Sequence, residues 1–172
     1  MKKLLVVVDY QVDFVNGSLG FNGAENLEDK IYKRILKAKE CGEDTVFTKD
    51  VHFEDYMSTE EGKNLPIMHC QNGSEGAALF GKIKEFENEF TVFEKGSFGS
   101  LELGNYIKDK NFEEITIVGL VSYICVFANA VICKSSLPNA HIIVEKDLVG
   151  AGDEKAQEIG FEAMKNLHID IK

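Results

Sequence analysis

The sequence has no tryptophan, only two prolines and no long apolar run among its 172 residues. Residues 4–8 form an apolar run after two lysines, but this run is shorter than the core of about 7–15 residues in a secretory signal. No segment approaches the roughly 20 apolar residues that span a bilayer. Hydrophobic residues still make up 44% of the chain, which argues against disorder. We therefore expect a globular protein with no membrane partner.

Basic residues are fewer than acidic residues. The chain has 19 Lys and Arg against 29 Asp and Glu, which gives a formal net charge of −10. Such a charge repels phosphate backbones, and no basic stripe with interleaved aromatic residues is present. Nucleic acid is therefore not an expected partner, which leaves small molecules and other proteins.

The four cysteines are irregularly spaced and form no CxxC pair, so neither a disulfide framework nor a zinc ribbon is indicated. A reducing, cytoplasmic environment is expected. The length of 172 residues predicts a single domain over residues 1–172, large enough to bury its own core.

Short runs rich in Val, Ile, Phe and Thr alternate with amphipathic segments along the whole chain. This alternation predicts right-handed βαβ crossovers and a parallel sheet. Strands are expected at residues 4–8, 45–48, 90–93, 114–118, 141–144 and 169–171. Helices are expected at residues 25–41, 75–87, 100–110, 123–136 and 153–166. The predicted fold is a three-layer α/β/α sandwich with a six-stranded, mainly parallel sheet.

Two connections, residues 10–24 and 50–74, are longer than a bare scaffold requires. Both leave the carboxyl ends of strands, where open α/β sheets bind ligands. Asp9 ends the first strand, and Asp50 lies just past the second. A carboxylate at the end of a buried strand loses favourable hydration, which costs free energy unless the carboxylate is paired with a cation or binds a ligand. Both are therefore candidates for chemistry, with a helix cap or a solvent contact as the alternative.

The segment after the second strand has a pattern of metal ligands. Because side chains alternate along an extended segment, Asp50 and His52 lie on the same side. His69 follows after a loop that is rich in acidic residues. Two imidazoles with one or two carboxylates suit Zn²⁺, Mn²⁺ or Fe²⁺. The sequence predicts a site for one divalent metal ion here, and an ordinary polar loop is the alternative.

Cys125 lies near the start of the expected helix over residues 123–136. Backbone N–H groups and the helix dipole favour a thiolate there, as expected for a nucleophile. The alternative is a buried core cysteine, the role we expect for Cys133; Cys41 and Cys70 are interpreted as fillers or loop thiols. Lys95 follows a strand directly and could face the same crevice, where it would hold the thiolate. His141 and His168 are assigned no role.

Five ordered segments together resemble the isochorismatase-like cysteine hydrolases, and within them the nicotinamidases. The segments are residues 8–14 (VDYQVDF), 48–52 (TKDVH), 65–70 (LPIMHC), 95–98 (KGSF) and 119–126 (GLVSYICV). The resemblance implies a Rossmann-like, six-stranded parallel sheet with an Asp–Lys–Cys triad beside one divalent metal ion. It also implies assembly as a homo-oligomer.

The resemblance assigns roles to individual residues. Asp9 would be the general base, Lys95 the cation of the triad and Cys125 the nucleophile. The implied metal ligands are Asp50, His52 and His69, with Glu61 as a fourth. A cis peptide at Leu120–Val121 would aim the amides of Val121 and Cys125 at an oxyanion, and Phe14 would line the substrate pocket.

The function implied is a metal-containing cysteine amidohydrolase that converts nicotinamide to nicotinic acid and ammonia through a thioester. Family members commonly have an acidic residue in place of Tyr123, and nicotinamidases often cover the ring with a Trp, so other small amides, ureido or carbamoyl compounds remain alternatives. Cys125 argues against a vinyl-ether hydrolase. A non-catalytic module that binds a small molecule or partner is another alternative, while an acidic receiver-type domain would leave His52, His69 and Cys125 unexplained.

Overall fold

The sheet of the protein, in a computed structural model that describes residues 1–172, has six strands that all run parallel. Their order across the sheet is β3-β2-β1-β4-β5-β6. The strands are β1 (Lys3–Val8), β2 (Asp44–Asp50), β3 (Thr91–Lys95), β4 (Glu114–Leu120), β5 (His141–Gly150) and β6 (Asp170–Ile171). The six expected strands and the α/β fold class are thus confirmed.

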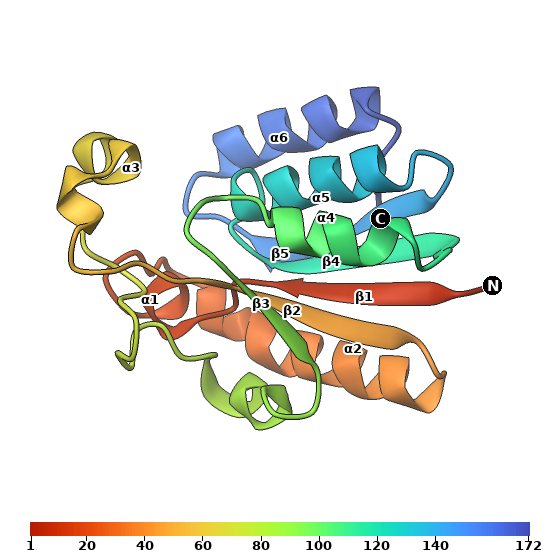
Figure 1. Ribbon diagram of the computed structural model, residues 1–172, viewed down its shortest axis with the longest axis horizontal. Helices are drawn as coiled ribbons and strands as arrows, with labels where there is room; N and C mark the ends of the chain where they lie inside the picture. Colours follow the sequence, from red (N-terminus) through yellow and green to blue (C-terminus); the bar gives the residue numbers. More distant parts are fainter.

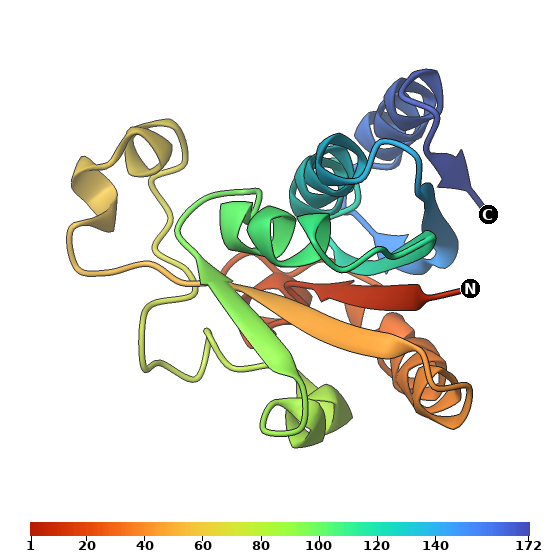
Figure 2. The same ribbon diagram turned by 45° about the vertical axis from the view of Figure 1, so that its right-hand side comes forward.

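Helices cover both faces of this sheet (Figures 1 and 2). The α-helices are α1 (Val12–Val15), α2 (Glu28–Glu40), α3 (Glu60–Asn64), α4 (Leu101–Lys108), α5 (Cys125–Ser136) and α6 (Glu154–Asn166). The 3-10 helices are η1 (Ala24–Leu27), η2 (Tyr56–Ser58) and η3 (Gly81–Phe86). None of the helices has the length and apolarity that crossing a lipid bilayer demands.

Alternating side chains of β1 belong to two separate hydrophobic cores, one on each face of the sheet. Leu4, Val6 and Val8 pack with residues of α4, α5 and α6 on one face of the sheet. Leu5 and Val7 pack with residues of α1, α2 and η3 on the other face. All five side chains are fully buried. A strand buried on both faces reads as a continuous apolar run, which is why β1 is visible in the sequence.

The strand connections reverse direction between β1 and β4, which pair with each other at the centre of the sheet. Gly119 of β4 lies opposite Val8 with a φ of 113°, and any side chain there would collide with the carbonyl oxygen of Val8. Asp9 follows directly with a φ of 44°, a left-handed conformation that is uncommon outside glycine and often found at functional sites.

Two expectations about the elements need correction. The helix expected over residues 75–87 is wrong, because only η3 is helical there. Gly81 has a φ of 52°, and Gly76 packs against the carboxylate of Asp13 with no room for a side chain. Strands β2, β3, β4 and β5 also end later than expected. Asp50 and Lys95 are therefore the last residues of β2 and β3, and they are paired with each other in the sheet.

Candidate active site

The structure brings Asp9, Lys95 and Cys125 together at the carboxyl ends of β1, β3 and β4. The Lys95 ammonium nitrogen lies 2.7 Å from Oδ2 of Asp9 and 3.8 Å from Sγ of Cys125. It also donates a hydrogen bond of 2.9 Å to the carbonyl oxygen of Ser97. Three side chains that are far apart in the sequence thus form one contact group.

This group is almost entirely withdrawn from solvent. Asp9 is fully buried, while Cys125 and Lys95 are 6% and 7% exposed. Thr48 donates a hydrogen bond of 2.6 Å to Oδ1 of Asp9. Burial raises the pKa of the Asp9 carboxyl, and the charge of Lys95 acts in the opposite direction. Burial alone would lower the pKa of Lys95, but the combined effect of Asp9, Cys125 and Asp50 outweighs it and raises the pKa, so Lys95 is held as a cation.

The expectation that the position of Cys125 favours a thiolate is wrong. Burial raises the pKa of the Cys125 thiol well above its ordinary value, and the negative charge of Asp9 raises it further. Lys95 acts in the opposite direction but does not prevail. The sequence shows the helix start, but not the carboxylate that tertiary structure brings next to the thiol. The resting site therefore holds a thiol beside a buried carboxylate.

Two free backbone amides accompany this thiol. Cys125 is the first residue of α5, and the Leu120–Val121 peptide before it is cis. The carbonyl oxygen of Val121 accepts hydrogen bonds from the amides of Ile124 and Val126, at 3.0 and 3.2 Å. The amides of Val121 and Cys125 themselves donate no hydrogen bond within the protein. Both N–H groups are therefore available to a ligand.

A second group of side chains lies next to Lys95 and has the composition of a metal centre. Asp50, His52, Glu61 and His69 each offer a ligand atom, and these atoms lie within 4.8 Å of one another. Oδ2 of Asp50 is 2.8 Å from Nε2 of His52 and 3.3 Å from Nε2 of His69. Oε1 of Glu61 is 3.7 Å from the Nε2 atoms of both histidines.

The surroundings of these side chains fit a divalent cation. Nδ1 of His69 lies 2.8 Å from the carbonyl oxygen of Ile67, so Nδ1 carries the hydrogen and Nε2 keeps its lone pair for a ligand. Burial and the charge of Asp50 raise the pKa of Glu61, a repulsion that a bound cation would relieve. Two imidazoles and two carboxylates suit Zn²⁺, Mn²⁺ or Fe²⁺. The four residues could therefore hold such an ion.

Gln11 and Asp13, which follow Asp9 in the sequence, hold the backbone around the metal-binding group in place. The sequence analysis did not identify either residue. The side-chain amide of buried Gln11 donates to the carbonyl oxygens of Asp50 and Ala77, at 2.8 and 2.9 Å, and accepts from the Asp50 amide at 2.8 Å. Oδ2 of Asp13 accepts a hydrogen bond of 2.7 Å from the amide of Cys70. The signal was available: Asp9, Gln11 and Asp13 alternate, and each bonds to a different part of the site.

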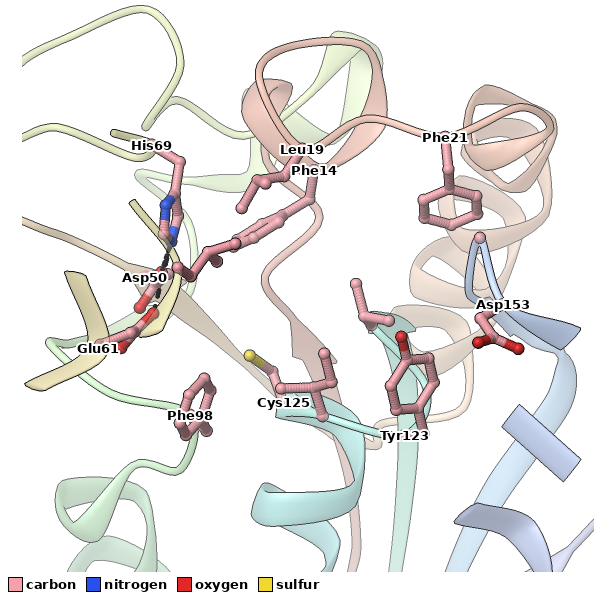
Figure 3. Close-up of a pocket in the computed structure, with 14 residues that line it drawn as sticks. Phe14, Leu19, Phe21, Asp50, Glu61, His69, Phe98, Tyr123, Cys125 and Asp153 are labelled. Carbon is pink, nitrogen blue, oxygen red and sulfur yellow. Dashed lines mark ion pairs between the residues drawn. The ribbon is translucent and has the colours of Figure 1, made fainter. Parts of the chain in front are cut away.

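A cavity of about 380 Å³ joins the two groups (Figure 3). Asp50, Glu61 and His69 line one end, and Cys125 lies at the middle of its wall. Phe14 also lines it, with its ring centroid 5.6 Å from that of His69. The cavity is large enough for a small organic ligand, which would lie between the thiol and the metal-binding group.

The fold and the site define a parallel α/β protein with a buried Asp–Lys–Cys group beside a candidate centre for a divalent metal. The family model "Isochorismatase domain" matches residues 3–171, so the chain belongs to the isochorismatase family of hydrolases. The resemblance recognised in the sequence is thereby confirmed. No curated protein sequence matches the chain.

Several solved structures are similar over the full chain. The nicotinamidase PncA from Bacillus subtilis is 25% identical, with a TM-score of 0.87 and coverage of 99% of each chain. The pyrazinamidase of Pyrococcus horikoshii, solved in complex with zinc, is 24% identical, with a TM-score of 0.87 and coverage of 100% of this chain and 99% of that one. The N-carbamoylsarcosine amidase from Thermoplasma acidophilum is 23% identical, with a TM-score of 0.82 and coverage of 100% and 96%.

Proposed function

We propose that the protein is a metal-containing cysteine amidohydrolase that converts nicotinamide to nicotinic acid and ammonia. The observation that carries the proposal is the position of Lys95, whose ammonium contacts both Asp9 and Cys125. Cys125 in turn lines a ligand-sized cavity. The similarity to the nicotinamidase from Bacillus subtilis supports the choice of substrate.

Formation of a thioester would begin with the Cys125 thiol. A carboxamide is a poor electrophile, so the sulfur must lose its proton as it attacks the carbonyl carbon. Asp9 is the base for this step, because it is the buried carboxylate that raises the pKa of the thiol. Lys95 stays positive and stabilises the charge shared by Asp9 and the sulfur.

The oxygen of the substrate carbonyl becomes negative in this step. The free amides of Val121 and Cys125 are the oxyanion donors, since neither is used within the protein. Such donors contribute about 3–4 kcal/mol to the stability of a transition state in the acyl-transfer enzymes where one has been removed.

Release of the product would reuse the same acid and base. Asp9 gives the proton that it took from the thiol to the departing nitrogen, so that ammonia leaves. Asp9 then removes a proton from a water molecule, which attacks the thioester and frees nicotinic acid and the thiol. A divalent ion held by Asp50, His52, Glu61 and His69 would supply a Lewis acid for the ring nitrogen of the substrate, directly or through water, and Phe14 would face the ring.

The test is ammonia release from nicotinamide by the purified, metal-supplied protein. We expect Cys125→Ala to lower the rate by at least about 10³-fold. The exposed cysteine gives the control, because Cys41→Ala should leave the rate unchanged. Full turnover by Cys125→Ala would refute the nucleophile. Ammonia released from a ureido compound but not from nicotinamide would keep the cysteine chemistry and correct the substrate.

A further inference from the structure

The cavity continues past Cys125 to an end that the proposed reaction with nicotinamide leaves empty. This distal end is formed by Phe21, Tyr123 and Asp153, opposite the metal-binding group (Figure 3). Gly152, which lies next to Phe21, also lines the cavity. The residues of the distal end come from three separate loops: the one before η1, the one between β4 and α5, and the one between β5 and α6. The bond to be cleaved would therefore lie in the middle of the cavity rather than at one of its ends.

Close packing against glycines positions the two loops that carry the aromatic side chains of the distal end. A methyl group at Gly160 of α6 would lie 2.8 Å from Cβ of Tyr123, so only glycine lets the Tyr123 loop pack this closely. A methyl group at Gly152 would lie 3.1 Å from Cβ of Phe21. The distal end is therefore a formed surface between apolar rings and not a gap left by loose loops.

The polar side chains of the distal end are the Asp153 carboxylate, which only accepts hydrogen bonds, and the Tyr123 hydroxyl, which can accept or donate one. Oδ1 of Asp153 caps α6 by accepting a bond of 2.9 Å from the amide of Ala156. Its other oxygen takes part in no hydrogen bond or ion pair within the protein, and neither does the hydroxyl of Tyr123. No positively charged side chain lines the cavity. A cationic donor therefore matches this end better than an anionic group does.

We propose that the distal end is a second substrate subsite, which takes a cationic, hydrogen-bond-donating group carried by the nitrogen of the scissile amide. The proposal rests on the proposed function for the position of the acyl part, between the metal-binding group and Cys125. In a planar trans amide the nitrogen substituent lies opposite the acyl group. A substituent would thus extend away from the metal-binding group and past Val121 towards Tyr123 and Asp153.

The reaction with such a substrate balances without any co-reactant except water. The sulfur of Cys125 bonds to the carbonyl carbon, and the thiol proton passes to Asp9. The carbon–nitrogen bond breaks, and Asp9 returns the proton to the nitrogen, so the leaving group is an amine instead of ammonia. Water then hydrolyses the thioester, and the products are a carboxylic acid and an amine that bears the cationic group.

Alkylation of Cys125 tests the subsite without requiring hydrolysis. The probes are 2-chloro-N-(2-guanidinoethyl)acetamide and its neutral counterpart of the same shape, 2-chloro-N-(4-methylpentyl)acetamide. Alkylation rates at Cys125 are followed by peptide mass spectrometry and divided by the rates at exposed Cys41 of the same protein molecules. This ratio corrects for the different intrinsic reactivities of the two probes and for the attraction of the cationic probe to the net negative charge of the protein. We expect the cationic probe to be preferred at Cys125 by about fivefold, the effect of a partly solvated ion pair.

Two matched variants complete the experiment. Asp153→Asn keeps a good helix cap but removes the charge, so the preference should fall to about one. Glu154→Gln removes the adjacent exposed charge, which does not line the cavity, and should keep the preference. Equal rates in the unaltered protein, a preference that survives Asp153→Asn, or no alkylation of Cys125 by either probe would overturn the proposal. If the unaltered protein does not hydrolyse nicotinamide but still prefers the cationic probe at Cys125, only the proposed function is contradicted.

Discussion

The side chain of Gln11 pairs with the backbone of Asp50 as a neighbouring strand would, accepting from its amide and donating to its carbonyl oxygen, both at 2.8 Å. Asp50 is the last residue of β2 and a member of the metal-binding group. Gln11 lies two residues after Asp9, so the segment that supplies the proposed base also sets the position of a proposed metal ligand.

Replacing Gln11 should therefore weaken metal binding. Gln11→Glu keeps the size of the side chain but faces two carbonyl oxygens with a carboxylate that has no hydrogen to donate. We expect the affinity for Zn²⁺ to fall by about tenfold or more, as for other groups that orient metal ligands. The measurement is competition with a chromogenic chelator. Asn166→Asp makes the same chemical change at the exposed end of α6 and should have no effect; an unchanged affinity in Gln11→Glu would contradict the positioning role.

The role of Glu61 can be distinguished from that of its neighbour Glu60 by substitutions that remove the charge of each carboxylate in turn. Glu61 lies 3.7 Å from both histidine nitrogens, whereas Glu60 takes no part in the group. We expect Glu61→Gln to lower the affinity for the divalent ion by about tenfold, since it removes one of two carboxylate donors. Glu60→Gln should leave the affinity as it is. Equal affinities of the two variants would show that three ligands suffice.

The raised pKa of the Cys125 thiol predicts slow alkylation in the resting protein. Iodoacetamide reacts with thiolates, and a pKa above the ordinary value means a smaller thiolate fraction at pH 7.5. Cys125 should therefore react more slowly than exposed Cys41. Asp9→Asn removes the negative charge beside the sulfur, which lowers the pKa of Cys125 and should speed its alkylation while abolishing hydrolysis. Slower alkylation in Asp9→Asn would contradict this account of the charges.

The ion pair between Asp9 and Lys95 should also contribute to the free energy of unfolding. Lys95→Met leaves a buried carboxylate without its cation, and the expected loss is about 3–5 kcal/mol in the free energy of unfolding at pH 8. The loss should be smaller at pH 5 than at pH 8, because burial raises the pKa of Asp9 and a larger fraction of this carboxyl is protonated, and so neutral, at the lower pH. Urea denaturation measures both values. Lys39→Met breaks an exposed pair with Glu89 and should cost at most about 1 kcal/mol. A pH-independent loss in Lys95→Met would show that Asp9 is not left charged.

The fold could be predicted from the sequence because strands buried on both faces, such as β1 and β4, read as continuous apolar runs. The expected helix over residues 75–87 failed because the conformation of Gly81 and the packing of Gly76 against Asp13 depend on the folded chain. Tertiary contacts likewise decide two properties of the site that the spacing of residues in the sequence does not reveal: the pKa of Cys125 and the role of Gln11.

The gathering of Asp9, Lys95 and Cys125 follows from parallel strands that end at the same edge of the sheet, and the five ordered segments point to it. The pKa of Cys125 could not be predicted, because its direction depends on burial and on the distance to Asp9. The role of Gln11 was missed although it alternates with Asp9 and Asp13, because the sequence does not show that its side chain pairs with the backbone of a distant segment.

The central pairing of β1 with β4 joins parts of the chain that are separated by most of its length, as the contact between Lys3 and Glu114 illustrates. Closing so long a loop is entropically unfavourable, and contacts of this kind are associated with slow folding. Asp9 lies on one side of this closure, and Cys125 lies on the other. The pairing that joins the two halves of the sheet therefore also creates the reactive centre, and a ribosome must synthesise both halves before the thiol meets its base.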